Sequence, residues 1–303
     1  MVSDNFLYRI PSNSKQKNLI TSPLRYPGSK KRLAEYIKHI IKQNCCYPNL
    51  FIEPFAGGAS VALKLLNEDI VRQIGLIEID PLVADFWKTV FFDTDWLIEQ
   101  IKTIAITVEQ WSIFKHSVYA TRRERALACL FLNRTSFSGI MARAGPIGGY
   151  QQKSQYKIDC RFSKGNLIQR IRHIGSFRNR VAFVWRISWK QGISRIRKKQ
   201  ELGKLPNSNL LFYFDPPFFE KANQLYNYYF DSRSHKLLRN YILTLEDNWI
   251  LSYDSPERVL KLYGNNLSSA NIEMRYSTGK CSVRRNGHKE IILSNMQLPV
   301  KLP

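Results

Sequence analysis

The sequence contains few of the residues that build disulfide frameworks and metal sites. Its 303 residues include five cysteines, an odd number, and no two of them form a Cys-x-x-Cys pair. The five histidines show neither His-x-His nor His-Glu-x-x-His spacing, so we expect no metal site. Sparse, unpaired cysteines are typical of proteins in a reducing compartment, which predicts a cytoplasmic protein.

Long apolar runs and several enzyme motifs are also missing. No run approaches the roughly 18 residues of a membrane span, and the first twenty residues lack the apolar centre of a secretory signal. We therefore expect no membrane partner. The sequence has no Gly-x-Ser-x-Gly elbow and no P-loop, so hydrolase and NTPase interpretations lack a nucleophile or a phosphate cradle.

Acidic residues are scarce: 24 Asp and Glu stand against 46 Lys and Arg, giving a formal net charge of +22. Between Arg161 and Lys204 the only acid is Glu201, and aromatic residues interrupt the basic ones. This pattern favours a nucleic acid whose phosphates exchange counterions for protein charges. A solvated basic surface is the alternative. The run Arg195–Lys199 is interpreted either as a phosphate-gripping loop or as a solvated linker.

Apolar runs and turn residues predict an α/β fold with a doubly wound sheet. A helix is predicted from Lys30, then a strand at Leu50–Ile52, a glycine turn, a helix, and a strand that ends near Glu78 and Asp80. Residues 91–178 break this rhythm and predict a mainly helical insert, while residues 1–22 predict a flexible tail. Further strands are expected at Val181–Ile187, Leu210–Phe214, Trp249–Tyr253 and Glu290–Leu293, with a helix at His235–Leu245.

The sharpest motif is LFYFDPPF, residues 211–218, in which an apolar strand ends at Asp215. Pro216 and Pro217 fix the backbone after the strand, so the Asp215 carboxylate and the Pro216 carbonyl can accept both hydrogens of one exocyclic amino group. This draws the nitrogen lone pair out of ring conjugation. Phe218 offers a face on which a flipped base can stack. The alternative is a strand-ending turn with a helix-capping Asp.

A second motif, FIEPFAGGAS at residues 51–60, places Gly57 and Gly58 between a strand and a helix. Glu78 follows Gly57 by 21 residues at the end of the next strand, where a carboxylate can accept hydrogen bonds from two ribose hydroxyls. Together they indicate a nucleoside-bearing cofactor, although the turn alone fits a purely structural role. Asp80 is an alternative ribose acid, but its place before Pro81 suits a helix cap equally well.

A third motif, RYPGSK at residues 25–30, precedes the first predicted helix. Tyr26 can stack on a flat ligand group, and Lys30 can bind a carboxylate. His235, at the start of a predicted helix, is interpreted as a cap or surface residue.

In this order, the three motifs resemble those of the Dam-type adenine-N6 DNA methyltransferases, the D12 class. LRYPGSK is similar to the family's N-terminal cofactor motif, FIEPFAGGAS and IEIDP to its cofactor and ribose motifs, and DPPF to its catalytic DPPY. FLNRTSFSG, residues 131–139, is similar to a segment of the family's target-recognition insert. The similarity covers roughly residues 24–298.

The resemblance implies a Rossmann-like, S-adenosylmethionine-dependent methyltransferase sheet with an inserted target-recognition domain. Residues 23–90 and 179–298 would form the catalytic domain and residues 91–178 the insert. The implied activity is transfer of a methyl group from S-adenosyl-L-methionine to adenine N6 in a short duplex DNA site. The implied cofactor-binding residues are Tyr26, Lys30, Glu53, Phe55, Gly57, Glu78 and Asp215.

For DNA, the resemblance implies that Phe137 fills the gap left by a flipped base while Arg134 and Ser138 lie beside the duplex. It suggests a restriction-modification or mobile-element enzyme, with a cognate restriction endonuclease as a conceivable partner. We expect a monomer, associated with the nucleoid in the cytoplasm.

Two positions depart from the family's pattern. Phe218 replaces the usual Tyr, which keeps the stacking face and removes a hydroxyl. Ser188 occupies a position where many relatives carry an acid, which weakens the expected contact to the cofactor's adenine amino group. A cytosine-N4 DNA methyltransferase and a non-catalytic DNA-binding relative remain as alternatives.

Overall fold

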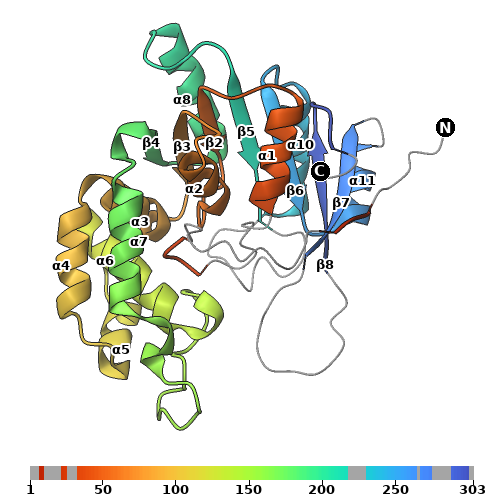
Figure 1. The fold of residues 1–303 in the computed structure, drawn as a ribbon. Helices are drawn as coiled ribbons and strands as arrows, with labels where there is room; N and C mark the ends of the chain where they lie inside the picture. The colour runs from red at the N-terminus through yellow and green to blue at the C-terminus, as the bar shows by residue number, and fades with distance from the viewer. Residues whose placement is uncertain are drawn as a thin grey trace.

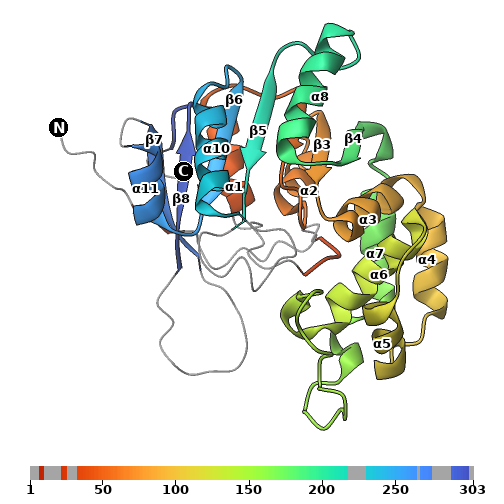
Figure 2. The ribbon, with the colours of Figure 1, turned by 180° about the vertical axis from the view of Figure 1, so that it is seen from behind.

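The computed structural model describes residues 7–9, 22–25, 33–217, 230–264, 267–274 and 288–299. Figure 1 shows a twisted sheet with helices on both faces and a separate group of helices beside one end of the strands. Figure 2 shows the same arrangement from behind. None of the helices in these ranges is long and apolar enough to cross a membrane.

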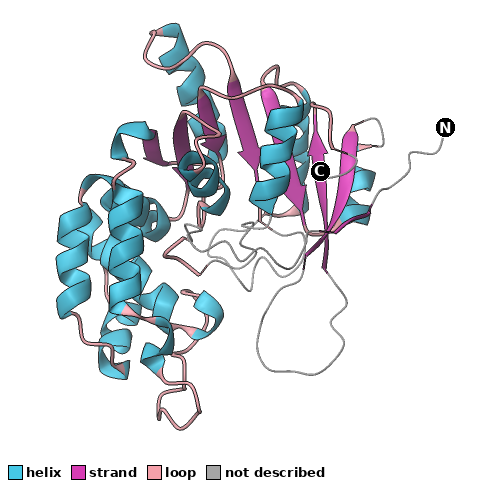
Figure 3. Ribbon diagram, in the orientation of Figure 1, coloured by secondary structure: helices cyan, strands magenta, loops and turns pink. Residues whose placement is uncertain are grey.

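The sheet contains eight strands among the described residues, in the order β1-β7-β8-β6-β5-β2-β3-β4. Strand β8 runs antiparallel to β6 and β7, and the remaining neighbours are parallel. Figure 3 shows the strands as one continuous layer. Their bounds are β1 Leu7–Arg9, β2 Leu50–Glu53, β3 Gln73–Glu78, β4 Val181–Arg186, β5 Leu210–Phe214, β6 Asn248–Tyr253, β7 Ser268–Met274 and β8 His288–Ser294.

The helices follow the strands in the alternation expected of an α/β protein. They are α1 Leu33–Gln43, α2 Ser60–Asn67, α3 Pro81–Phe92, α4 Thr94–Thr103, α5 Val108–His116, α6 Arg122–Thr135, α7 Lys164–Gly175, α8 Trp189–Glu201, α10 Ser232–Leu243 and α11 Pro256–Tyr263. Short 3-10 turns cover Phe137–Gly139, Ile158–Arg161 and Arg178–Arg180.

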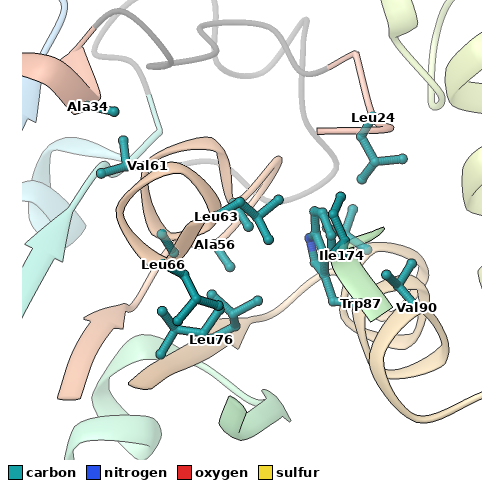
Figure 4. Packing of buried hydrophobic residues seen from close by; sticks show 14 of the residues in the cluster. Leu24, Ala34, Ala56, Val61, Leu63, Leu66, Leu76, Trp87, Val90 and Ile174 are labelled. Carbon is teal, nitrogen blue, oxygen red and sulfur yellow. The ribbon is translucent and has the colours of Figure 1, made fainter. Parts of the chain in front are cut away.

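Two apolar cores lie on opposite faces of the sheet. Strand β2 contributes to both, because successive side chains of a strand point to opposite faces: Phe51 packs on one side and Leu50 and Ile52 on the other. The first core continues from α1 and α2 through α3 into the helical group. Figure 4 shows part of it, with Leu63 of α2 near Trp87 and Ile174.

Helices α4 to α7 form the helical group, which lies between α3 and β4 in the sequence. Trp111, Phe131 and Ile174 of this group belong to the same core as Phe51 of the sheet. An ion pair also crosses the boundary: Asp85 of α3 accepts from Arg125 of α6 at 2.6 Å. The apolar contacts and this ion pair hold the helical group firmly to the sheet.

The sequence predicted most of this architecture. The α/β class is confirmed, as are strands β2 to β6 and β8. Residues 7–9, within the predicted flexible tail, instead form edge strand β1 beside β7. Arg195–Lys199 lies in helix α8, so both interpretations of it as a loop or linker are wrong. Ile193 and Ile196 are buried one helical turn apart, which fixes the run as a helix.

Candidate active site

Three acidic residues lie at the carboxyl ends of three neighbouring parallel strands. Asp215 follows β5, Glu53 ends β2 and Glu78 ends β3. After β2 the chain continues to β3 and β4 on one side and returns to β5 on the other, so the strand order reverses between β2 and β5. Open α/β sheets bind ligands in the crevice at such a reversal.

The glycine turn between β2 and α2 is held by contacts from two other elements. Gly57 has a φ of +44°, a left-handed conformation in which glycine is favoured over residues with a side chain. The Ala56 N–H donates to Ile77 O at 3.0 Å, and Trp87 Nε1 of α3 donates to Gly57 O at 2.8 Å. The turn is thus fixed at the end of β3, beside Glu78.

Glu78 is buried, and its carboxylate is bonded to the backbone on both oxygens. Oε2 accepts from the Gly57 N–H at 2.8 Å and Oε1 from the Asp80 N–H at 2.9 Å. Burial raises the pKa of Glu78 to about 7, although these backbone donors favour the charged form. A carboxylate oxygen has two lone pairs, so both oxygens can still accept from a ligand hydroxyl.

Asp80 has the capping role that the sequence allowed for it. Its Oδ1 accepts from the Leu82 N–H at 2.8 Å at the start of α3, with Pro81 in the first turn. Glu78, unlike Asp80, therefore keeps its side chain directed at the glycine turn.

Glu53 is hydrogen-bonded to the first turn of helix α2. It is 3% exposed, and its Oε1 accepts from the Ala62 N–H at 2.9 Å. Burial, with a contribution from the negative charge of Asp215, raises the pKa of Glu53 to about 8, so the side chain is mainly protonated at neutral pH. Glu53 ties the end of β2 to the first turn of α2.

Asp215 is positioned by the neighbouring strand β6. Ser252 Oγ donates to Asp215 Oδ1 at 3.0 Å, and the same Oγ is 2.8 Å from the Tyr213 hydroxyl. Pro216 is buried and Pro217 is half-buried. The sequence did not point to Ser252, because a serine in an apolar strand carries no motif of its own.

An aromatic group lies beside this strand end. Phe55 and Phe230 meet edge to face at 5.5 Å between ring centroids, and Phe230 meets His235 at 5.3 Å. His235 Nδ1 is 2.9 Å from the Tyr253 hydroxyl, and burial lowers the pKa of His235 to about 4, so the ring is neutral. The interpretation of His235 as a cap or surface residue is therefore wrong, since it packs into the core at 3% exposure.

The C-terminal end of α6 joins the predicted recognition segment to the first cofactor motif. Asn133 accepts from the Arg25 N–H at 2.6 Å and donates from Nδ2 to Arg25 O at 2.7 Å and Gly139 O at 3.1 Å. Gly139 has a φ of +77°, and a Cβ there would stand 2.4 Å from Arg25 O. Asn133 and Gly139 thus place the residue before Tyr26 against the Phe137–Gly139 turn.

The same turn presents the predicted DNA-contacting residues. Phe137 is 66% exposed, Ser138 is exposed with a φ of +55°, and Arg134 is half-buried at the end of α6. The loop behind them is anchored, because Trp111 Nε1 donates to Ser136 Oγ at 2.9 Å and the Ile147 N–H to Thr135 O at 2.8 Å. A bulky exposed aromatic on a fixed turn can enter a partner's surface at little entropic cost.

The structure brings together most of the predicted site residues. Glu53, Gly57, Glu78 and Asp215 share one edge of the sheet, and Arg134, Phe137 and Ser138 share one end of α6. Helix α6 passes near the first group: burial raises the pKa of its Cys129, and the nearby charges of Asp80 and Glu78 contribute. Tyr26, Lys30 and Phe218 lie outside the described residues. Among the residues that the structure describes, no cluster of His, Cys, Asp or Glu could hold a metal ion.

Comparison with protein families matches this arrangement to one family. The model of the D12 class N6 adenine-specific DNA methyltransferases matches residues 26–278, which is most of the chain. This range contains the FIEPFAGGAS, FLNRTSFSG and LFYFDPPF segments and begins at Tyr26 of RYPGSK. A search of curated proteins gave no match. The α/β sheet with acids at its carboxyl edge is the fold expected of such an enzyme, and members of this family use S-adenosylmethionine. The chain therefore belongs to the D12 class N6 adenine-specific DNA methyltransferases and is an enzyme that methylates adenine in DNA.

Proposed function

We propose that this methyltransferase transfers the methyl group of S-adenosyl-L-methionine directly to adenine N6 in a short duplex site, with Asp215 holding the amino group. The observation that carries the proposal is the position of Asp215 and Glu78 at the carboxyl ends of β5 and β3, on either side of β2. One carboxylate serves the base and the other the cofactor, at the point where the strand order reverses.

The residues present fit the cofactor. The left-handed turn at Gly57 lets the backbone approach a ligand closely, and the Glu78 oxygens retain lone pairs for the two ribose hydroxyls. Ile79, the next residue, is 43% exposed and can cover one face of the adenine ring. When bound, S-adenosylmethionine supplies an electrophilic methyl group on a sulfonium. Glu53, Phe55, Tyr26 and Lys30 complete the proposed set.

We propose that Ser188 weakens one cofactor contact. Ser188, at the position of the acid in many relatives, caps helix α8: its hydroxyl donates to Gln191 Oε1 at 2.8 Å and accepts from the Gln191 N–H at 3.3 Å. Its hydroxyl is therefore engaged, which supports a weaker hold on the cofactor's adenine amino group.

Asp215 and Pro216 act on the target base. The carboxylate and the Pro216 carbonyl would accept the two hydrogens of adenine N6, so that the nitrogen lone pair leaves the ring's π-system and can attack the methyl carbon in line. The bond from that carbon to the sulfonium sulfur would break as the new C–N bond forms, leaving S-adenosylhomocysteine, and N6 would then release one proton to solvent. Ser252 keeps the carboxylate in place. Phe218 stacks on the flipped base, and neither a covalent enzyme intermediate nor a metal is required.

The helical group engages the duplex. Phe137 occupies the space left by the flipped adenine, Arg134 and Ser138 lie against the strands, and the excess of basic residues holds the phosphates. We further propose a monomer in the cytoplasm, on nucleoid DNA, of restriction-modification or mobile-element type with or without a cognate endonuclease.

The decisive experiment incubates purified protein with unmethylated duplex DNA and methyl-labelled S-adenosylmethionine, then digests the DNA to nucleosides. We expect label in N6-methyl-2′-deoxyadenosine. Label in N4-methyl-2′-deoxycytidine would transfer the mechanism to cytosine, and absence of label would leave a DNA-binding protein without catalysis.

An Asp215→Ala variant tests the catalytic assignment. We expect methyl transfer to fall at least about 10²–10³-fold, because the amino group loses its charged acceptor, while DNA binding at low salt stays within about twofold. The exposed helix residue Asp95 provides a matched control, since Asp95→Ala also removes a carboxylate and should leave transfer unchanged. Equal loss of binding and transfer in Asp215→Ala would contradict the assignment.

A further inference from the structure

Four arginines from separate segments converge where helix α6 ends. Arg134 is the penultimate residue of α6, and Arg25 is joined to the adjacent Asn133 by two hydrogen bonds. Arg161 ends the 3-10 turn whose neighbour Phe162 packs 5.7 Å from Phe131 of α6, measured between ring centroids. Arg170 lies on α7, close enough for its charge to act on Arg134.

The charges of these arginines act on one another. Burial, followed by the positive charges of Arg25, Arg170 and Arg161, lowers the pKa of Arg134 to about 10. Burial lowers the pKa of Arg25 as well, with a contribution from Arg161. Arg25, Arg161 and Arg170 therefore all lie within electrostatic reach of the partly buried Arg134.

No carboxylate balances this arginine cluster within the described part of the chain. Arg25 Nη1 and Arg134 Nε are buried and have no hydrogen-bond partner there. Arg239 Nε on α10 is a third buried guanidinium N–H without a partner in these residues, but Arg239 is not among the arginines whose charges act on Arg134. Several other arginines pair with acids, as in Arg125–Asp85, Arg180–Asp69 and Arg197–Asp247. Buried guanidinium N–H groups without acceptors are costly, and so is repulsion between neighbouring cations. An anion that accepts from several of them removes both costs.

The setting selects the class of anion. A guanidinium presents a planar fork of donors that matches phosphate oxygens, and several arginines can share one phosphate. The arginine cluster lies at the base of the Phe137–Gly139 turn, whose exposed aromatic is proposed to enter the duplex. A residue that enters the base stack brings its flanking residues to the sugar-phosphate backbone.

We propose that Arg25, Arg134, Arg161 and Arg170 form a binding site for one phosphate of the DNA backbone beside the flipped adenine. The proposal rests on the proposed function and deepens it, because it assigns a phosphate contact to residues outside the recognition turn. The contact fixes the position of the duplex and reads no sequence.

The test measures the affinity for a duplex by fluorescence anisotropy across a series of salt concentrations. We expect the double variant Arg134→Gln/Arg170→Gln to bind about tenfold more weakly, and the slope of log K against log salt to lose about 0.9 in magnitude, the value for one phosphate contact. The losses should be equal for duplexes with and without the recognised site, since the contact carries no sequence information.

Two further variants complete the comparison. Arg178→Gln removes one exposed arginine beside the amino end of β4, at the opposite edge of the sheet, and should leave affinity and slope unchanged. Arg161→Gln changes an exposed side chain, so it keeps the test valid if the double variant does not fold. A wild-type slope and affinity in both the double variant and Arg161→Gln would overturn the proposal.

Two further measurements distinguish failure of the phosphate site from failure of the proposed function and from binding of the cofactor's carboxylate. In methyl transfer, the double variant should show a KM for DNA raised about tenfold and an unchanged kcat. If the wild type transfers methyl groups but the variants bind DNA normally, only the phosphate site fails; if the wild type transfers none, the proposed function fails. Calorimetric binding of S-adenosylmethionine without DNA should be unaffected, and a loss there alone would assign the arginine cluster to the cofactor's carboxylate instead.

Discussion

The edge of the sheet and the end of helix α6 bury charge in opposite ways. At the sheet, Glu53 and Glu78 are bonded to backbone N–H groups, and Asp215 accepts from Ser252. At α6, Arg25 and Arg134 keep buried donors without acceptors in the described residues. The acids of the first region already have donors and offer spare lone pairs to neutral donors such as hydroxyl and amino groups. In the second, no acidic side chain among the described residues pairs with the buried guanidinium donors.

Arginine itself does not cause this difference. On α8, Arg197 pairs with Asp247, and Arg195 lies over the Trp185 ring at 4.7 Å. Both arginines therefore have a partner within the protein: Asp247 precedes β6 at its amino end, and Trp185 lies near the carboxyl end of edge strand β4. The comparison therefore teaches that a ligand site is indicated by how a charge is satisfied, and much less by how many charges a segment contains.

The largest expected effect concerns the buried acids. The pKa values of Glu53 and Glu78 are raised by burial to about 8 and about 7, from an ordinary 4.5, so the folded protein binds more protons than the unfolded chain across that range. Their contribution to the free energy of unfolding is fully present below about pH 4.5 and is lost as pH rises toward 8, by an amount on the order of several kcal/mol. Urea unfolding from pH 5 to 8 measures it.

Glu53→Gln, which cannot ionise, should flatten this pH dependence, while exposed Glu99→Gln should preserve it. The idea fails if stability rises over this interval in the wild type and in Glu99→Gln alike.

A second prediction concerns the close contact between Gly139 and Arg25, which connects the two regions. Gly139→Ala puts a Cβ 2.4 Å from Arg25 O at a φ of +77°, so we expect a loss of about 2 kcal/mol in stability and weaker binding of both DNA and cofactor. Gly149→Ala is the matched control, because its φ is +73° but nothing lies within 4 Å of the added Cβ. Thermal unfolding and titrations measure the difference; equal effects would show that backbone strain alone is responsible.

A third prediction tests how Ser252 holds Asp215, the residue proposed to bind the adenine amino group. Ser252→Ala removes the hydrogen bond to Asp215, so kcat should fall about tenfold with an unchanged KM for DNA. Ser252→Thr should recover most of the rate because it keeps the hydroxyl. Ser294→Ala removes another buried hydroxyl of the sheet, bonded to Trp249 O at 2.6 Å, and is expected to leave kcat intact.

The smallest effect compares two arginines directly. Arg197→Gln loses its ion pair with Asp247 and should lower the free energy of unfolding by up to about 1 kcal/mol. Arg134→Gln relieves repulsion and should leave it unchanged or raise it by a similar amount. Calorimetry in the absence of DNA gives both values, and destabilisation by Arg134→Gln would show that its charge is satisfied after all.

The sequence predicted the parts of the site that depend on local order. Glu78 and Asp215 end apolar strands, and buried parallel strands read directly as apolar runs, so their positions at the sheet edge followed. Ser252 and His235 could not be predicted in this way, because their roles come from contacts with Asp215 and Tyr253 on other segments. The arginine cluster depends even more on tertiary structure. Its members are spread between positions 25 and 170, and no spacing in the sequence predicts that they lie together.

The two hydrogen bonds between Asn133 and Arg25 have a thermodynamic consequence. They make Arg25, the first residue of the RYPGSK motif, a direct neighbour of the turn proposed to enter DNA, so on the proposed function the two ligands would act on one shared element. Coupling of this kind is reciprocal: the factor by which DNA raises the affinity for S-adenosylmethionine is the factor by which S-adenosylmethionine raises the affinity for DNA. An enzyme built this way holds each substrate most tightly when the other is present, which favours the complete ternary complex over either binary one.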